Sequence, residues 1–562
     1  MMTKPWLKHY PDIIPEEISI DEFDSLADFI VDACKRAGDR PAFENMDHQI
    51  SYSEVEQASR NLGAYLQHLG LQKGDRVAVM MPNLLQYPVS LFGILRAGLV
   101  GVNTNPLYTP RELKHQLTDS GARAIIILEN FINVLEKVIG DTQVEHVIVV
   151  RIGDMLPFPK GLITNFVVKY VKKMVPAYSY SGGIPFNKAL KEGARHELKR
   201  HPLTHDDIAF LQYTGGTTGV AKGAMLTNRN MLANVQQGTR WLSMVGFKEH
   251  EEIVITALPL YHIFALTANC MVFLNLGGLN ILITNPRDMA GFVKTLEGVP
   301  FTAITGVNTL FNGLLNTPGF GNLDFSGLKL TLGGGMAVQR SVAEKWKQVT
   351  KVPLIEAYGL TETSPAACMN PMTLQDYNGS IGLPLPSTIC AIRGEDGSLL
   401  AAGEVGELII SGPQVMKGYW QRPEETAKVL DDEGWLKTGD MAKMDEEGFF
   451  YIVDRKKDMI LVSGFNVYPN EIEDVVALHP KVLEVGAIGV EHEKSGEVVK
   501  IIVVRKDPSL SIDELRGHCR ENLTGYKNPR YIEFVEELPK TNVGKILRRE
   551  LRDMYGKPVN SE

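Results

Sequence analysis

Short apolar runs alternate with amphipathic stretches along the first part of the chain. Residues 51–69 carry apolar side chains at helical spacing, and the apolar run 76–81 that follows has the length of a buried strand. The alternation continues through runs 124–128 and 146–150, which are rich in isoleucine and valine. Short β-branched runs separated by helices are typical of a mostly parallel sheet covered on both faces. The pattern therefore predicts an α/β fold for this part of the chain.

The pattern changes after about Gly403. Residues 406–412 and 448–453 are apolar stretches that begin or end at glycine, which is typical of antiparallel strands. Five consecutive charged residues, 454–458, come next. Such a cluster usually lies in a solvated turn, and here it also separates the large first part of the chain from a smaller tail. We therefore predict a hinge near residues 454–458.

The tail has the pattern of a small domain with its own core. Its predicted elements are a helix, two strands, a second helix opened by a capping box, and a last strand, at residues 471–478, 482–490, 498–504, 511–514 and 531–535. About a hundred residues are enough for a domain that folds on its own. We predict two domains, residues 1–455 and 456–562.

Length and charge narrow the class of function. A chain of 562 residues exceeds what one hydrophobic core usually supports, which agrees with at least two domains. Its 58 basic and 67 acidic side chains give a formal net charge of -9, whereas nucleic-acid-binding proteins normally carry a basic excess. We therefore expect no nucleic-acid partner. The net charge does not exclude anionic substrates, because local hydrogen-bond donors rather than net charge build the sites that bind them.

Cysteine spacing and the apolar segments indicate a cytoplasmic protein. The five cysteines are widely spaced and form no CxxC pair, so we expect neither a zinc site nor a disulfide framework. No apolar segment of signal-peptide length follows the first lysines. Residues 263–283 carry no charge, but Gly277 and Gly278 interrupt them. We predict a buried helix and a buried strand there rather than a membrane span.

A segment rich in glycine and threonine carries the strongest local signal of chemistry. It follows an apolar run and contains residues suited to phosphate binding: Tyr213, Thr214, Gly215, Gly216, Thr217, Thr218, Gly219 and Lys222. A strand that ends in such residues exposes backbone N–H groups and hydroxyls, which suits a polyphosphate, and the lysine adds a cation. The spacing differs from GxxxxGK[ST], so this is no Walker loop. Taken alone, the segment fits a flexible turn as well as a phosphate site.

Five segments, in family order along the chain, resemble the signatures of the acyl-adenylate-forming (AMP-binding) superfamily, which includes acyl-CoA synthetases and the adenylation domains of peptide synthetases. They are residues 212–223, 358–362, 434–440, 451–458 and 539–545. The amino-acid sequences of two stretches, TGGTTGVAKG and LVSGFNVYPNE, are similar to those of bacterial long-chain fatty-acid–CoA ligases in particular. Ala221 departs from the proline of many superfamily members, which fits this bacterial branch.

The resemblance implies a fold and a reaction. The fold is a large adenylation domain of several α/β subdomains, followed by a small, mobile α+β domain. A long-chain fatty acid attacks ATP to give an acyl-adenylate and pyrophosphate, and coenzyme A then takes the acyl group while AMP leaves. Magnesium (Mg2+) is the implied metal. Two alternatives stay open: an adenylate-forming enzyme for another acceptor or chain length, and a fatty-acid or nucleotide binder without catalysis.

The resemblance also assigns roles to residues by their position in the motifs. Glu362 would bind magnesium, Lys545 would bridge the attacking carboxylate and the α-phosphate, and Thr214 would hold phosphates with its loop. The implied nucleotide contacts are Tyr358, Gly359 and Gly334 at adenine, Thr361 at a phosphate, and Asp440 and Arg455 at the ribose. Taken singly, Glu362 fits a solvated turn and Lys545 an ordinary surface lysine.

Three further residues receive roles from the same resemblance. Lys457 occupies the implied hinge, and Gly464 lies beside the implied pantetheine tunnel, where a side chain would block the thiol. His262 would line the carboxylate site, although a histidine among apolar residues is more often a core residue. The acyl chain would then pass along apolar neighbours, with candidates Val307, Thr309 and Leu332.

Residues 160–175 raise the question of a membrane. They contain four lysines and no acidic residue, with Phe166, Tyr170 and many aliphatic side chains in between. This composition is typical of a helix that lies on an anionic bilayer, here the inner face of the cytoplasmic membrane. An amphipathic helix packed on the protein body explains it equally well. The sequence determines neither the preferred chain length nor the oligomeric state, so a homodimer stays open.

Overall fold

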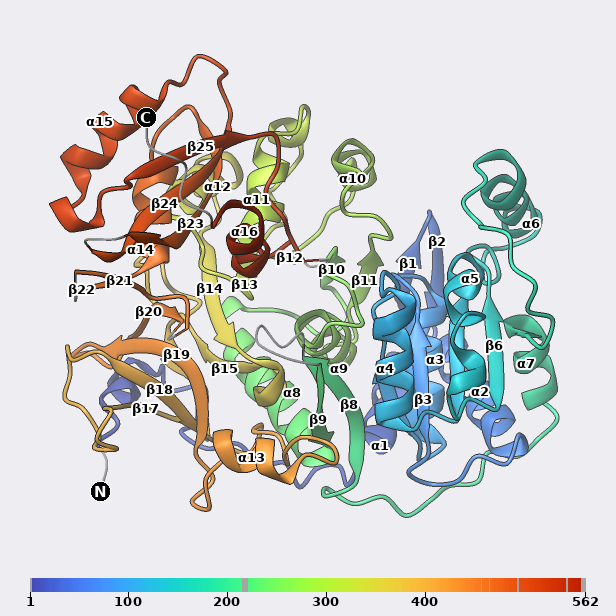
Figure 1. Ribbon diagram of the computed structural model, residues 1–562. Coiled ribbons are helices and arrows are strands. Elements are labelled where there is room, and N and C mark those ends of the chain that lie inside the picture. The colour runs from blue at the N-terminus through green and yellow to red at the C-terminus, as the bar shows by residue number, and fades with distance from the viewer. Residues whose placement is uncertain are drawn as a thin grey trace.

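The computed structural model describes residues 3–214, 221–455, 457–463, 465–492, 495–541 and 544–556. Its strands form four sheets, of nine, seven, five and four strands (Figure 1). The five-stranded sheet belongs to a small C-terminal domain, and the other three belong to the large N-terminal part. The α/β fold with a large N-terminal and a small C-terminal domain is thus confirmed.

The seven-stranded sheet has the order β7-β6-β5-β3-β4-β8-β9 and is parallel except for its last pair. Its strands are β3 (Arg76–Met80), β4 (Val100–Asn103), β5 (Ala124–Leu128), β6 (His146–Val150), β7 (Ile184–Pro185), β8 (Ile208–Thr214) and β9 (Lys222–Thr227). Its helices are α2 (Tyr52–His68), α3 (Gln86–Arg96), α4 (Pro110–Ser120), α5 (Ile132–Leu135) and α7 (Phe186–Gly193). Alternate residues of β5 enter two different apolar clusters, because helices cover both faces.

The nine-stranded sheet has the order β16-β15-β14-β13-β12-β10-β11-β1-β2. Its strands are β1 (Pro41–Asn45), β2 (His48–Ser51), β10 (Ile253–Thr256), β11 (Leu279–Leu282), β12 (Ala303–Gly306), β13 (Leu330–Gly334), β14 (Leu354–Gly359), β15 (Ala366–Met369) and β16 (Leu383–Pro384). Its helices are α1 (Leu26–Ala37), α8 (Asn228–Leu242), η6 (Ala265–Met271), α9 (Val272–Asn275), α10 (Met289–Leu296), α11 (Asn308–Leu315) and α12 (Arg340–Thr350).

The uncharged stretch 263–283 forms η6, α9 and β11, as predicted. Most of its residues are buried in the protein, because these elements pack against α8 and the nine-stranded sheet. Within the ranges that the structure describes, no helix is both long and apolar enough to cross a membrane.

The four-stranded antiparallel sheet follows in the chain. Its strands are β17 (Ile389–Arg393), β18 (Gly406–Ser411), β19 (Leu436–Met444) and β20 (Phe450–Arg455), with α13 (Pro423–Val429) between the second and third. The predicted strands at 406–412 and 448–453 are β18 and β20. The C-terminal end of β20 leads directly into the small domain.

The C-terminal domain has apolar clusters of its own. Its elements are β21 (Ile460–Val462), β22 (Phe465–Val467), α14 (Pro469–Ala477), β23 (Val482–His492), β24 (Gly496–Arg505), α15 (Ile512–Asn522), β25 (Tyr531–Val535) and α16 (Arg548–Tyr555). Every predicted element is present, while the hairpin β21–β22 and α16 were not predicted. The apolar residues of α16, Leu551, Met554 and Tyr555, follow helical spacing, but only Leu551 is buried.

Short helical segments complete the chain. They are η1 (Pro5–His9), η2 (Glu129–Phe131), η3 (Ile139–Asp141), α6 (Lys160–Phe166), η4 (Val167–Val171), η5 (Ser243–Val245), η7 (Phe320–Asn322), η8 (Thr361–Thr363) and η9 (Gly525–Lys527). Residues 160–175, expected as one helix, are thus α6 and η4 followed by residues outside any element. This segment projects from the body beside the seven-stranded sheet (Figure 1, upper right).

Candidate active site

A cavity of about 1430 Å³ lies between the N-terminal part and the small domain. Its walls include the carboxyl ends of β13 and β14, where ligands bind in open α/β sheets. Most residues singled out in the sequence line it: Tyr213, Thr214, Lys222, His262, Gly334, Tyr358, Gly359, Thr361, Glu362, Asp440, Arg455, Lys457 and Lys545. Segments far apart in sequence therefore converge on one space.

Several expected site residues fall outside the described ranges. These are Gly215, Gly216, Thr217, Thr218, Gly219 and Gly464. The residues at the two ends of the glycine-rich segment are described. Thr214 ends β8 and Lys222 begins β9, and both residues line the cavity.

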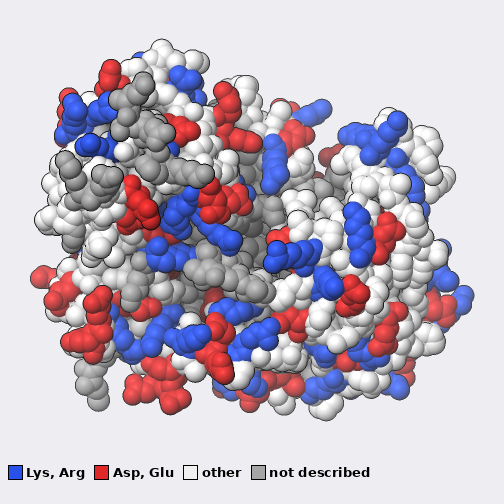
Figure 2. Space-filling view, viewed as in Figure 1, with Lys and Arg blue, Asp and Glu red and all other residues white. Residues whose placement is uncertain are grey.

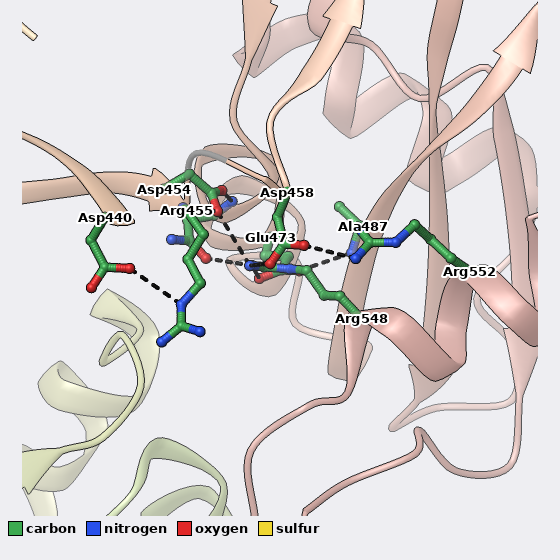
Figure 3. Close-up of polar contacts among 9 residues, drawn as sticks. Asp440, Asp454, Arg455, Asp458, Glu473, Ala487, Arg548 and Arg552 are labelled. Carbon is green, nitrogen blue, oxygen red and sulfur yellow. Dashed lines mark hydrogen bonds and ion pairs between the residues drawn. The ribbon is translucent and has the colours of Figure 1, made fainter. Parts of the chain in front are cut away.

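Asp440 joins the two residues that were expected at adenine and ribose. Its Oδ2 accepts a hydrogen bond of 2.6 Å from the Tyr358 hydroxyl. Its Oδ1 lies 3.2 Å from Arg455 Nε (Figure 3). Burial raises the pKa of Tyr358 far above its ordinary value, so this hydroxyl stays a donor. The carboxylate is 3% exposed and holds both partners in fixed positions at the cavity wall.

Glu362 and Lys222 meet at a residue that the sequence did not suggest, Tyr419. The Tyr419 hydroxyl donates a hydrogen bond of 2.7 Å to Glu362 Oε1, and Lys222 Nζ lies 4.6 Å from the centre of the Tyr419 ring. Lys222 also forms a 2.8 Å ion pair with Glu425. The phenol thus fixes the carboxylate that was expected to bind the metal. A cation over an aromatic face is favourable, which keeps Lys222 close by.

Lys545 reaches the cavity from the small domain and is partly buried. Burial lowers the pKa of Lys545 to about 8; Arg455 acts in the same direction, and Asp440 and Glu362 oppose it. Gly335, at a φ of +80°, leaves room for the lysine: a Cβ there would lie 3.3 Å from Lys545 Cε. Gly335 directly follows Gly334, which was expected at adenine, so this glycine turn also makes space for the lysine.

Two hydrogen bonds hold the segment that carries Lys545, one within the small domain and one to the N-terminal part. Thr541 Oγ1 accepts a 3.0 Å hydrogen bond from the backbone N–H of Lys545. Thr309 of α11 donates a 2.9 Å hydrogen bond to the carbonyl of Gly544. The second bond crosses from the N-terminal part to the small domain, so it holds the lysine in this domain arrangement.

His262 and Gly359 line the cavity, and their surroundings constrain the imidazole and the glycine. Burial lowers the pKa of His262 to about 3, with Lys545 adding to the effect, so the imidazole stays neutral at physiological pH. A Cβ at Gly359 would lie 1.8 Å from the Pro365 carbonyl oxygen, so packing of the backbone alone demands glycine there. The Tyr213 hydroxyl donates a 2.8 Å hydrogen bond to Asp119, which ties this ring to α4.

Lys457 also lines the cavity, next to the chain segment that was expected to be the hinge. Burial lowers the pKa of Lys457 to about 8, and the neighbouring Arg455 guanidinium adds to the effect. Two lysines with a similarly depressed pKa, Lys457 and Lys545, therefore face one space. A cavity lined by cations of this kind suits an anion.

Arg548 connects the segment around the expected hinge to the small domain (Figure 3). Its guanidinium lies 3.3 Å from Asp454 and 2.7 Å from Glu473, and it donates to Asn470. Burial raises the pKa of Asp454 to about 6, against the opposing effect of Arg548. Arg552 adds a 2.8 Å ion pair with Asp458. The start of α16, three residues after Lys545, is thereby tied to the end of β20.

Family comparison identifies the class of protein. Residues 30–420 match the AMP-binding enzyme family, and residues 471–545 match the AMP-binding enzyme C-terminal domain. The chain therefore belongs to the AMP-binding enzymes, as its motifs predicted.

Particular relatives narrow the class. The long-chain-fatty-acid–CoA ligase of Yersinia pestis is 59% identical over 553 residues, which span 98% of each chain. The protein of the same name from Bacillus subtilis (strain 168) is 41% identical, over 98% of this chain and 97% of the relative. Among solved structures, ATP-bound MatB from Rhodopseudomonas palustris has a TM-score of 0.80 at 27% identity, covering 95% of this chain and 99% of that one.

The Arg548 contacts generate a prediction on stability. Arg548→Gln leaves the buried Asp454 carboxylate and the partly buried Glu473 carboxylate without their guanidinium, which costs about 3–5 kcal/mol. The neighbouring Arg549 is 64% exposed, so Arg549→Gln changes stability by less than about 0.5 kcal/mol. Calorimetric unfolding of the two full-length variants measures the difference. Equal transitions for both would show that the Arg548 contacts contribute nothing.

Proposed function

We propose that this protein is a long-chain-fatty-acid–CoA ligase of the AMP-forming type. It joins a fatty acid to ATP, releasing pyrophosphate, and then transfers the acyl group from the acyl-adenylate to coenzyme A. The observation that carries the proposal is the convergence of Lys545, Glu362 and the Asp440–Arg455 pair on one cavity, in a chain 59% identical to ligases of that name.

In the first step the fatty carboxylate attacks the α-phosphorus of ATP. The carboxylate is already ionised at neutral pH, so the site needs no general base. The site must hold the two reactants in the correct position and supply positive charge, because two anions must approach each other. The Lys545 ammonium supplies that charge between the carboxylate and the α-phosphate, and His262, neutral in its buried position, borders the same place.

Asp440, Arg455 and Tyr358 hold the nucleoside part in this proposal. Tyr358 and Arg455 leave some lone pairs of the Asp440 carboxylate free, and these accept hydrogen bonds from the ribose hydroxyls. Arg455 has further N–H groups that donate hydrogen bonds to the ribose oxygens. Tyr358 and Gly334 border adenine, and Thr361 and the segment 214–219 receive the phosphates. Each of these contacts is a prediction for a nucleotide-bound structure.

Magnesium fits the residues present at Glu362. The described residues offer no cluster of three or more His, Cys, Asp or Glu side chains that would form an all-protein metal site. Magnesium instead is commonly held by one or two carboxylates together with substrate phosphates and water. Glu362 would be that carboxylate, oriented by Tyr419, and the bound ion would neutralise charge on the phosphates.

The second step requires a change of domain arrangement. Lys545 fills space beside Gly335 in the present arrangement, which suits adenylation. We place the hinge at residues 454–458, with domains 1–455 and 456–562. Rotation about Lys457 withdraws Lys545 and brings the region of Gly464 to the cavity, where the coenzyme A thiol attacks the mixed anhydride and AMP leaves.

Substituting Lys545 tests the assigned roles. Lys545→Ala removes the cation needed when two anions meet, so ATP–pyrophosphate exchange with oleate falls about a hundredfold or more. Thioester formation from supplied oleoyl-AMP and coenzyme A falls far less, because the lysine serves only the first step. Lys481→Ala, at a lysine paired with Glu514 outside the cavity, is the control.

Equal losses in both half-reactions would contradict the role of Lys545. Wild-type enzyme that forms no AMP from ATP with any fatty acid would overturn the proposed function. Acyl-AMP that accumulates in the presence of coenzyme A would indicate another acceptor.

The depressed pKa of Lys545 predicts a pH dependence. The ammonium form, required for adenylation, predominates below a pKa of about 8 and is lost as pH rises through it. The kcat/KM for ATP reports groups of the free enzyme, so it is level below pH 8 and declines above. Lys545→Arg keeps its charge at every pH used, and its profile stays level. A decline shared by both enzymes would assign it to another group, such as Lys457.

We also propose that the protein works in the cytoplasm, in peripheral contact with the anionic inner face of the membrane. All five cysteines are free and buried, which suits a reducing compartment. Among residues 158–174, seven large apolar side chains are each more than half exposed: Phe158, Leu162, Ile163, Phe166, Tyr170, Val171 and Met174. Such a concentration of apolar side chains in water is unusual and marks a docking surface.

The charges around this projecting segment favour a lipid surface. No acidic residue occurs from 155 to 191, a stretch with six lysines. Two of the four lysines in the segment face the body, since Lys169 forms a 2.6 Å ion pair with Glu129 and Lys160 lies 3.6 Å from Asp47. Lys172 and Lys173 are exposed. Figure 2 shows basic and uncharged surface together at this projection (upper right), a combination that suits anionic headgroups above an apolar layer.

Liposome binding tests this contact. The double change Phe166→Asp and Val171→Asp removes two exposed apolar side chains and adds repulsion, so binding to vesicles that contain phosphatidylglycerol falls about tenfold or more. Leu399→Asp, at an exposed leucine on the body, leaves binding unchanged. Activity on octanoate, which is soluble, stays at the wild-type level. Undiminished vesicle binding by the double variant would refute the contact.

A further inference from the structure

Helix α11 of the N-terminal part carries two polar side chains that donate hydrogen bonds to the small domain. The Thr309 hydroxyl donates to the carbonyl of Gly544 at 2.9 Å, and Asn312 Nδ2 donates to the carbonyl of Leu483, also at 2.9 Å. Residues three apart lie on the same face of a helix. One face of α11 therefore holds the small domain at two points, in segments that are distant from each other in sequence.

The carbonyl that Asn312 reaches lies at an irregularity of β23. The pairing of β23 with β24 shifts its register between Val482 and Glu484, so Leu483 is an extra residue in this strand. The extra residue of a β-bulge is left unpaired in the ladder. The bulge therefore presents a backbone acceptor of the small domain to α11.

The carbonyl that Thr309 reaches belongs to a residue whose conformation favours glycine. Gly544 has a φ of +82°, in the region that side chains other than hydrogen rarely allow. A Cβ there would lie 2.7 Å from Thr309 Oγ1 and 3.2 Å from Val307 Cγ2. Because Lys545 directly follows Gly544, this close approach fixes the backbone next to the lysine that enters the cavity.

The N-terminal part itself holds both donors in place. Asn312 Oδ1 accepts a 3.0 Å hydrogen bond from Asn316 Nδ2, which orients the amide so that its Nδ2 faces Leu483. At the start of the helix, Asn308 and Gln339 exchange two hydrogen bonds of 3.0 Å, which tie α11 to the start of α12. The two donors therefore lie on an element that is anchored independently of the small domain.

We propose that Thr309 and Asn312 are positioning residues for the adenylation step, because their two hydrogen bonds hold the small domain where Lys545 enters the cavity. Rotation of the small domain for thioester formation would break both bonds. The pair therefore favours the first half-reaction and contributes nothing to the second. This assignment rests on the proposed ligase function and adds the residues that stabilise one of its two domain arrangements.

The strength of the contact suits an arrangement that forms and breaks. One hydrogen bond between neutral groups changes an equilibrium constant by about two- to tenfold. Two such bonds together favour the adenylation arrangement by about tenfold, and the small domain can still break them once in every catalytic cycle. Their loss is therefore measurable without preventing folding.

Half-reactions of full-length variants test the proposal. Thr309→Val and Asn312→Ala, combined in one enzyme, remove both donors and leave Lys545 in the chain. ATP–pyrophosphate exchange with oleate falls about fivefold or more, while thioester formation from supplied oleoyl-AMP and coenzyme A stays at the wild-type rate. Replacing the valine by serine, as Thr309→Ser, returns a hydroxyl to this position and recovers part of the lost exchange.

Chemical labelling of Lys545 reports the domain arrangement independently of activity. Trace acetylation with acetic anhydride in the absence of nucleotide, followed by mass spectrometry, measures how often the Lys545 amine is accessible. The double variant withdraws this lysine from the cavity more often, so its labelling at Lys545 is about fivefold or more faster. Labelling at Lys191, an exposed lysine of α7, stays at the wild-type rate.

Thr317 and Asn522 provide matched controls. The Thr317 hydroxyl donates to the carbonyl of Gly313 in α11, and Asn522 Nδ2 donates to the carbonyl of His518 in α15, each at 2.8 Å. Neither bond crosses between the domains. Thr317→Val combined with Asn522→Ala therefore changes neither half-reaction and leaves Lys545 labelling at the wild-type rate.

Either of two outcomes for the double variant would overturn the inference. One is a ratio of the two half-reaction rates equal to that of the wild type, and the other is unchanged labelling of Lys545. Wild-type enzyme that shows no pyrophosphate exchange with oleate would instead overturn the proposed function. The two failures are therefore distinguishable.

Discussion

The placement of the Lys545 ammonium in the cavity between the two domains is the constraint on which the arrangement of this protein depends. A cation removed from water is costly unless anions lie nearby. Asp440 and Glu362 oppose that cost only in part, because the pKa of Lys545 still lies near 8. The phosphates of ATP and the carboxylate of the acid would offset the remainder. The substrates would therefore stabilise the same domain arrangement that they need, which explains how closure and binding can be one event.

The end of β20 connects the nucleotide site to this lysine. Adjacent residues of a strand point to opposite faces, so Arg455 turns to Asp440 while Asp454 turns to Arg548 of the small domain (Figure 3). Arg548 follows Lys545 by three residues. A nucleotide held by Asp440 and Arg455, as proposed, would lie one residue along the strand from the contact that anchors the lysine segment. The position of Lys545 would then depend on whether the nucleotide is bound.

The sequence predicted the parts of the structure that local pattern determines. The apolar runs became β3, β5 and β6, and the motifs placed Glu362 and Lys545 in one cavity. Partners brought together only by the fold were missed. Tyr419 and Arg548 belong to no periodic pattern. Each matters because it contacts a residue distant in sequence: Tyr419 contacts Glu362, and Arg548 contacts Asp454. Composition alone did not show whether residues 160–175 pack on the body or project from it. The solvent exposure of their side chains distinguishes the two, and exposure depends on the fold.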